Sequence, residues 1–165
     1  MAKEIERKFL IDRGWADIFE RVFLGRDGTK MPEGTSLEQG YLAMHDPSVR
    51  VRVSNDSAWI TIKGVSKEGG LVRDEYEYEI PVADGRAIMG LCKKTLRKVR
   101  YKVSFGGKTW DVDHFLGPLE GLWLAEVEVE STEEARNVEL PPWVHTEVTG
   151  DERYTNAYLA EHGLP

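Results

Sequence analysis

The sequence contains almost no cysteine and no long apolar run. Cys92 is the only cysteine in 165 residues, which excludes a disulfide framework and a cysteine-based metal cage. No stretch approaches the roughly 20 apolar residues that a transmembrane helix needs. The opening residues, MAKEIERKFL, carry charges where a secretory signal has an apolar core. We therefore expect a soluble, cytoplasmic protein that does not bind a membrane.

A positive charge balance is also missing. The chain has 22 Lys and Arg against 29 Asp and Glu, a formal net charge of -7. Proteins that coat nucleic acid usually present a basic surface, so this balance argues against a nucleic-acid partner but leaves room for a local anion site. The composition, 41% hydrophobic and 31% charged, is typical of a globular chain. With no linker or repeat visible, we expect one domain over residues 1–165.

Alternation of apolar and polar residues with a period of two dominates the chain and predicts about eight β-strands. The strictest example is Val49-Arg50-Val51-Arg52-Val53. The expected strands cover residues 3–11, 36–45, 49–53, 59–63, 73–80, 98–103, 110–113 and 125–130. Turn signals such as Gly69-Gly70 and Gly106-Gly107 separate them, and such short connections indicate antiparallel pairing.

Four segments have helical periodicity instead: residues 15–24, 83–94, 132–138 and 151–162. In the first, Trp15, Ile18, Phe19 and Val22 share one face. In the second, we expect Ile88, Leu91 and Cys92 to face inward. The predicted class is therefore α+β, mainly β.

The charged faces of the strands are segregated by sign. The acidic sets are Glu4/Glu6, Glu75/Glu77/Glu79 and Glu126/Glu128/Glu130, and the basic sets are Arg50/Arg52 and Lys98/Arg100/Lys102. On a single strand, such a face normally lies in solvent. A solubilising surface does not require like charges to cluster in this way, whereas a site for a metal and a triphosphate does.

Two architectures fit this pattern. A closed barrel would place the charges in its lumen and leave an apolar outer face for the helices to cover. A β-sandwich would place the charges outside. In the barrel, carboxylates could hold Mg²⁺ or Mn²⁺, which prefer oxygen ligands, and Arg and Lys could contact phosphoryl oxygens. Alternation alone does not choose between barrel and sandwich.

A series of short motifs resembles the CYTH domain of the triphosphate tunnel metalloenzyme superfamily, in the same order over almost the whole chain. Glu4-Ile5-Glu6-Arg7-Lys8 is similar to the N-terminal ExExK signature of that family. The other matching motifs are Gln39-Gly40-Tyr41-Leu42, Arg50-Val51-Arg52, Thr61-Ile62-Lys63, residues 73–81, Lys98-Val99-Arg100, residues 110–115, Ala125-Glu126-Val127-Glu128 and residues 149–156.

The resemblance implies a closed eight-stranded antiparallel tunnel with helices packed outside, a divalent metal and a triphosphate substrate. The implied metal ligands are Glu4, Glu6, Glu126 and Glu128, with Asp113 as a further candidate. The implied phosphate contacts are Lys8, Arg50, Arg52, Lys63, Lys98 and Arg100, with Arg73 as a further candidate. The implied catalytic set is Glu4, Glu6, Lys8, Glu75, Glu77 and Lys98. Within it, Glu75 and Glu77 would position a metal-bound water or steady the cations.

For function, the resemblance favours hydrolysis of inorganic triphosphate to pyrophosphate and phosphate. Thiamine triphosphatase and adenylyl cyclase are alternatives within the superfamily, and a polyphosphate- or nucleotide-binding module is an alternative without catalysis. The carboxylates argue against the module, because phosphate binding alone needs cations. We expect a monomer or a homodimer. Glu79 and Glu130 are expected in solvent, while Tyr41, His114, Asp151 and Arg153 receive no role.

Overall fold

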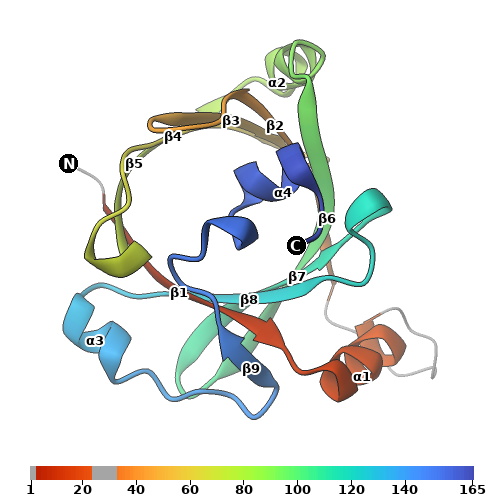
Figure 1. Cartoon of the computed structure of the whole chain (residues 1–165). Helices are drawn as coiled ribbons and strands as arrows, with labels where there is room; N and C mark the ends of the chain where they lie inside the picture. Colours follow the sequence, from red (N-terminus) through yellow and green to blue (C-terminus); the bar gives the residue numbers. More distant parts are fainter. Residues whose placement is uncertain (1–2, 24–32) are drawn as a thin grey trace.

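The computed structural model describes residues 3–23 and 33–165. Its sheet has nine strands in the order β5-β4-β3-β2-β6-β7-β8-β1-β9, and β1 also pairs with β5 (Figure 1). The strands are β1 (Lys3–Ile11), β2 (Thr35–Ala43), β3 (Ser48–Val53), β4 (Ala58–Lys63), β5 (Val72–Ile80), β6 (Lys94–Phe105), β7 (Lys108–Phe115), β8 (Trp123–Glu128) and β9 (Val144–Glu147). The helices are α1 (Arg13–Phe23), α2 (Val82–Met89), α3 (Thr132–Arg136) and α4 (Asn156–His162). Three short 3-10 turns are η1 (Glu68–Gly70), η2 (Gly117–Leu119) and η3 (Glu152–Tyr154).

The pairing of β1 with β5 closes eight of these strands into an antiparallel barrel. This seam is short: only Lys3–Asp74, Glu4–Arg73 and Ile5–Val72 pair across it. On its other side, β1 pairs with β8 over residues 6–10. A ring of paired strands confirms the barrel and excludes the sandwich, since a sandwich consists of two stacked sheets.

Strand alternation decides which side chains face outward, and two apolar clusters form there. In the first, Phe9 of β1, Trp110 of β7 and Val127 of β8 pack with Phe19 of α1 and with Trp143. In the second, Val51, Val53 and Ala58 of β3 and β4 pack against Met89 of α2. The helices and loops that cover these apolar faces remove them from water, which stabilises the fold by about 25 cal/mol per Å² of apolar surface buried. On each of these strands, the residues that alternate with the outward-facing ones consequently point into the lumen.

Helix α4 differs from the other helices because it lies over the lumen (Figure 1). Its Leu159 is buried in an apolar cluster with Leu96, Phe115 and Leu124. These three lumen positions are the next inward-facing neighbours of Lys98, Asp113 and Glu126 on their strands. The cluster therefore forms an apolar layer beside the charged layer. The expectation of helices packed outside holds for α1, α2 and α3.

The expected elements differ from the observed ones mainly at their ends. Strand β9 was not predicted. The second helix ends at Met89, where the N–H of Gly90 donates to Arg86 O, and Lys94 already begins β6. The prediction that Leu91 faces inward is wrong, because its side chain is 73% exposed. The last helical segment contains η3 before α4 begins at Asn156. Leu24, the predicted end of the first helix, lies outside the described residues, as does the side chain of Val22.

Within residues 3–23 and 33–165, no helix is long and apolar enough to cross a bilayer.

Candidate active site

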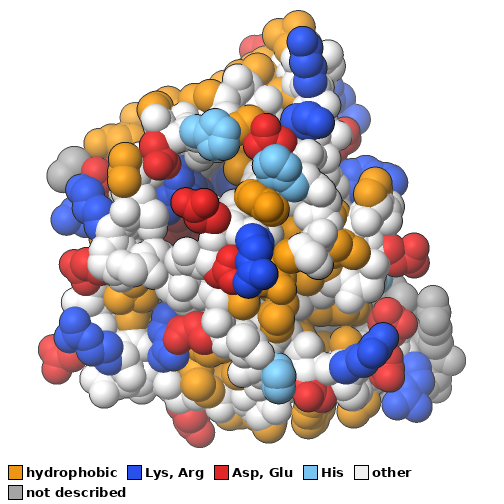
Figure 2. Space-filling view, viewed as in Figure 1, with side chains coloured by type: hydrophobic (Ala, Val, Ile, Leu, Met, Phe, Trp, Pro, Cys, Tyr) orange, Lys and Arg blue, Asp and Glu red, His pale blue; other side chains and the backbone are white. Residues whose placement is uncertain are grey.

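The barrel lumen contains a cavity of about 640 Å³. In Figure 2 the surface is hollowed at this position, with acidic and basic side chains at the hollow. Most of the predicted site residues line the cavity: Glu4, Glu6, Lys8, Arg50, Arg52, Lys63, Arg73, Glu75, Glu77, Arg100, Glu126 and Glu128. Lys98 and Asp113 are the two predicted site residues that do not. The inward interpretation of the charged faces is therefore correct.

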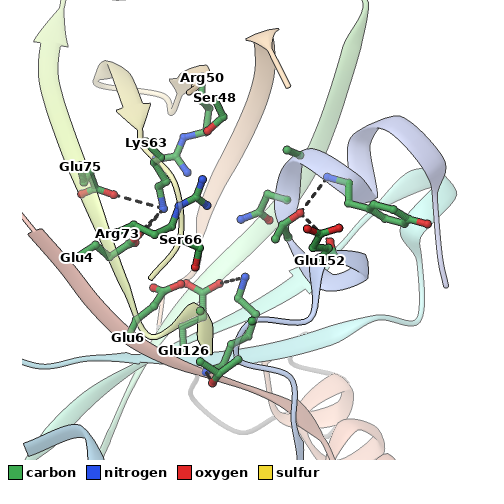
Figure 3. A pocket seen from close by; sticks show the side chains of 18 of the residues that line it. Glu4, Glu6, Ser48, Arg50, Lys63, Ser66, Arg73, Glu75, Glu126 and Glu152 are labelled. Atoms are coloured by element: carbon green, nitrogen blue, oxygen red, sulfur yellow. Dashed lines mark hydrogen bonds and ion pairs between the residues drawn. The ribbon is translucent and has the colours of Figure 1, made fainter. Parts of the chain in front are cut away.

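The acidic side of the cavity is formed by β1 and β8. Glu6 is directly opposite Glu128 in the strand register, and Lys8 is opposite Glu126. The Glu6 and Glu126 carboxylates lie side by side in Figure 3, and Lys8 Nζ is 3.3 Å from Glu126 Oε1. Burial would raise the pKa of Glu126, but the charges of Lys8 and Arg100 outweigh it and lower this pKa to about 2.

Glu6 is different because its carboxylate has no side-chain hydrogen bond or ion pair to any described residue. Burial, followed by the negative charges of Glu126 and Glu4, raises the pKa of Glu6 well above its ordinary value. Glu128 likewise has no such partner among residues 3–23 and 33–165, and burial with the charge of Glu4 raises its pKa. For these two carboxylates, burial and neighbouring negative charges therefore outweigh the more distant cations, such as Lys63.

Lys63 links the acidic side to β5. Its Nζ donates to Glu4 Oε1 at 2.9 Å and to Oε2 at 2.8 Å, and lies 3.3 Å from Glu75 Oε2 (Figure 3). Burial would raise the pKa of Glu4, but the adjacent Lys63 lowers it below its ordinary value. Lys63 therefore occupies the position of a counter-ion between two carboxylates.

The basic side of the cavity comes from β3, where Arg50 and Arg52 are two residues apart and share the inward face. Arg50 Nη2 donates to Thr61 Oγ1 at 3.0 Å and lies 3.6 Å from Glu77 Oε2. The buried Nε of Arg50 has no hydrogen-bond acceptor in the described part of the chain. Burial, with the charges of Arg50 and Arg100, lowers the pKa of Arg52 to about 10. Such a cationic wall is suited to an anionic ligand.

Lys98 and Asp113 lie behind the cavity wall and are completely buried. Asp113 accepts hydrogen bonds from Lys98 Nζ at 2.7 Å and from Arg100 Nε and Nη2 at 2.7 and 2.8 Å. Burial would raise the pKa of Asp113, but these two cations hold it well below its usual range. Both oxygens of Asp113 are thus engaged by cations, and this carboxylate orients Arg100 in the wall.

The lumen also contains residues that the sequence interpretation missed. Asp111 of β7 lines the cavity and lies 3.2 Å from Arg100 Nη1. It shares the strand parity of Asp113, which is a signal that could have identified it. Asn156, Tyr158 and Glu161 of α4 line the cavity too. Their placement depends on the packing of α4 over the lumen, which strand periodicity does not encode.

The residues that had no assigned role now have positions. Tyr41 is buried and lines the cavity. His114 instead lies among the outer-face aromatics, with its ring stacked on Trp123 at 4.2 Å, away from the carboxylates. Asp151 and Arg153 pair with each other at 2.7 Å at the start of η3. Glu79 and Glu130 are exposed, as expected.

The carboxylates suit a hard divalent cation, since all of the donors are oxygens. In the described part of the chain, the carboxylates of Glu6 and Glu128 also have no hydrogen-bond or ion-pair partner. Within the described ranges, no three acidic or imidazole groups are already arranged as a metal cage. Lys8 and Lys63 lie among these carboxylates instead. A metal would have to displace those ammonium groups, which are on flexible side chains.

Comparisons with known proteins agree with this geometry. The CYTH domain model matches residues 2–156. An inorganic triphosphatase of Acetivibrio thermocellus is 42% identical, with 98% of this chain and 96% of the relative covered. An inorganic triphosphatase of Nitrosomonas europaea is 33% identical, with 95% and 96% covered. The crystal structure of an inorganic triphosphatase matches with a TM-score of 0.62 and 30% identity, covering 97% of this chain and 95% of the other.

CYTH triphosphatases depend on metal ions in general, which is consistent with the oxygen donors in this lumen. The family match extends over almost all of the sequence, and the motifs that suggested it converge on one charged cavity. The chain therefore belongs to the CYTH domain family.

Proposed function

We propose that this protein hydrolyses inorganic triphosphate to pyrophosphate and orthophosphate inside the barrel, with Mg²⁺ or Mn²⁺ as cofactor. One observation carries the proposal: carboxylates and cations face each other across the lumen cavity of about 640 Å³. The names of the relatives support the same substrate, since both are inorganic triphosphatases that align over at least 95% of this chain.

The substrate would lie against the cations of the lumen. Arg50 and Arg52 present guanidinium groups, which can bind phosphoryl oxygens in bidentate fashion. Lys8, Lys63 and Arg73 would contact the remaining oxygens. Arg73 Nε donates to Gly64 O at 3.1 Å, and Arg73 Nη2 lies 3.6 Å from Asp46 Oδ1. Lys98 and Arg100, held by Asp113, would contribute positive potential from the wall.

The metal would be held by Glu4, Glu6, Glu126 and Glu128. A divalent cation bound there would neutralise phosphate charge and lower the pKa of a water ligand. Its binding would release Lys8 from Glu126 and Lys63 from Glu4, so that both ammonium groups could turn to the phosphates. Glu75 and Glu77 would steady Lys63 and Arg50, which they contact at 3.3 and 3.6 Å. We leave Asp113 out of this set because both its oxygens are engaged by cations.

A substrate panel tests the proposal. Inorganic triphosphate, ATP, thiamine triphosphate and long polyphosphate are incubated with Mg²⁺, Mn²⁺ or EDTA, and the products are identified. We expect pyrophosphate and orthophosphate from inorganic triphosphate with either metal and none in EDTA. Formation of cyclic AMP from ATP would instead indicate an adenylyl cyclase. Faster turnover of thiamine triphosphate would indicate that this compound is the substrate, and tight binding without turnover would indicate a binding module.

A further inference from the structure

Gln39 belongs to a motif that the proposed function leaves without a role. It lies on β2, opposite Arg52 of β3 on one side and Leu96 of β6 on the other. Its side chain is 0% exposed and does not line the cavity. A buried amide requires hydrogen-bond partners for both its oxygen and its nitrogen. The identity of those partners therefore shows what this residue holds in place.

Both partners of Gln39 are side chains that line the cavity. Its Oε1 accepts a hydrogen bond from Arg52 Nε at 3.0 Å, and its Nε2 donates to Tyr41 Oη at 3.4 Å. Bonding through Nε fixes the plane of the guanidinium group. The two terminal nitrogens of Arg52, which carry four further N–H donors, have no hydrogen-bond acceptor among the described residues.

Every other described cation of the lumen is paired with a carboxylate. Lys8 pairs with Glu126, Lys63 with Glu4, Arg50 with Glu77, Arg73 with Asp46, Lys98 and Arg100 with Asp113, and Lys102 with Asp111. Within residues 3–23 and 33–165, Arg52 is the lumen cation that has a neutral acceptor and no carboxylate partner. A carboxylate in place of the amide would accept the same hydrogen bond but would cancel the positive charge.

We infer that Gln39 is a positioning residue that aims Arg52 into the lumen while leaving its charge uncompensated, so that the terminal nitrogens are available to a phosphoryl group. The inference rests on the proposed function, because it needs a phosphate ligand in the lumen. Tyr41 contributes indirectly, since its hydroxyl oxygen holds the amide nitrogen and so fixes which amide atom faces Arg52.

The test compares Gln39→Glu with Arg52→Gln. Affinity for inorganic triphosphate is measured by calorimetry in EDTA, where the cations alone bind the ligand, and KM and kcat are measured with metal. We expect Gln39→Glu to lower the metal-free affinity about tenfold and to raise KM similarly, with a smaller change in kcat. The unfolding free energy should be retained, because the new carboxylate pairs with Arg52. A merely structural Gln39 would leave the affinity unchanged, since glutamate is isosteric and still accepts from Nε.

A double-variant cycle provides the control. Gln39→Met removes the acceptor, so the guanidinium loses its orientation and the affinity falls. In the Arg52→Gln background, Gln39→Met should cause no further loss, because it acts only through Arg52. This cycle also keeps the inference testable if Gln39→Glu does not fold.

Wild-type affinity in Gln39→Glu would overturn the inference, as would an equal loss from Gln39→Met in both backgrounds or wild-type affinity in Arg52→Gln. None of these results affects the proposed function, which depends on turnover by the wild-type protein. Conversely, absence of wild-type turnover would remove the function while the metal-free affinities still report on Gln39.

Discussion

Lys63 Nζ donates to both carboxylate oxygens of Glu4, at 2.9 and 2.8 Å. Lys63 is on β4 and Glu4 on β1, and β5 lies between these strands, so the contact spans the lumen-facing side of β5. Under the proposed function, Glu4 would bind the metal and Lys63 the phosphate, so this ion pair would separate when both ligands bind. The resting lumen is therefore held together by its own cations.

Glu4→Gln should lower metal-dependent hydrolysis by about 100-fold or more, because an amide is a poor replacement for an anionic metal ligand. The unfolding free energy should fall by less than about 2 kcal/mol, since Lys63 keeps its contact with Glu75 at 3.3 Å. Steady-state kinetics and urea unfolding measure the two effects. Glu79→Gln, at an exposed position that does not line the cavity, is the matched control and should retain wild-type kinetics.

The pKa of Glu6 gives a pH-dependent expectation. Because burial and the neighbouring Glu126 and Glu4 raise this pKa above the ordinary 4.5, the folded protein binds a proton more readily than the unfolded chain does. In EDTA this contribution to stability is lost as the pH rises through the folded-state pKa. Glu6→Gln should therefore exceed the wild type in unfolding free energy by about 1 kcal/mol at about pH 8 and match it near pH 4.5.

Added Mn²⁺ should stabilise the wild type but have a weaker effect on Glu6→Gln, because a metal that binds the folded state shifts the unfolding equilibrium. Urea titrations with and without metal provide the comparison. Parallel pH profiles for the wild type and the variant in EDTA would contradict the assignment of an unpaired Glu6.

Alternation predicts which residues face the lumen. It does not predict which of these residues line the cavity and which lie buried behind its wall. The period-two pattern places Glu4, Glu6 and Lys8 on one strand face, and the structure has them on one side of the cavity. The same pattern gives Lys98 and Arg100 equal status, yet only Arg100 lines the cavity. The Lys98 ammonium group is 3.4 Å from Asn156 Oδ1 of α4, a contact between residues 58 apart in sequence. Local periodicity carries no information about such a contact.

The missed strand has a similar explanation. β9 has only four residues, Val144–Glu147, too few for alternation to be distinguished from chance. Its pairing with β1 joins distant parts of the chain, as in the Phe9–Glu147 pair. The barrel likewise closes through the pairing of β1 with β5, which also joins distant parts of the chain. Residue spacing did not predict this closure, whereas the motif resemblance did.

Asp113→Asn should destabilise the fold by roughly 3 kcal/mol or more, because it removes the carboxylate that pairs with the buried Lys98 at 2.7 Å and that accepts two hydrogen bonds from Arg100. Lys102→Gln is the contrast: it removes another cation–carboxylate pair, with Asp111, but the Lys102 side chain is 65% exposed. Its cost should be less than about 1 kcal/mol. Chemical unfolding measures both, and equal effects would contradict the distinction between a buried clamp and a surface pair.

The glycine contact beside the barrel seam gives a further expectation. Gly150 has φ 78°, and a Cβ there would lie 2.1 Å from the carbonyl oxygen of Gly69. Gly150→Ala should therefore separate η1 from residues 148–151 and cost roughly 2–4 kcal/mol. Gly107→Ala is the matched control, because Gly107 has φ 74° but nothing within 4 Å of its Cβ position. The control should cost only about 1 kcal/mol by thermal or chemical unfolding.

The most direct test of the proposed activity is ³¹P NMR of inorganic triphosphate mixed with the wild-type protein and with Glu126→Gln, in Mg²⁺, Mn²⁺ or EDTA. With metal, we expect the wild type to release one pyrophosphate and one orthophosphate per triphosphate. In EDTA, we expect it to release neither product. Glu126→Gln should be folded by circular dichroism and should lose this turnover. An unchanged triphosphate spectrum with wild-type protein and either metal, or wild-type turnover by Glu126→Gln, would contradict the account.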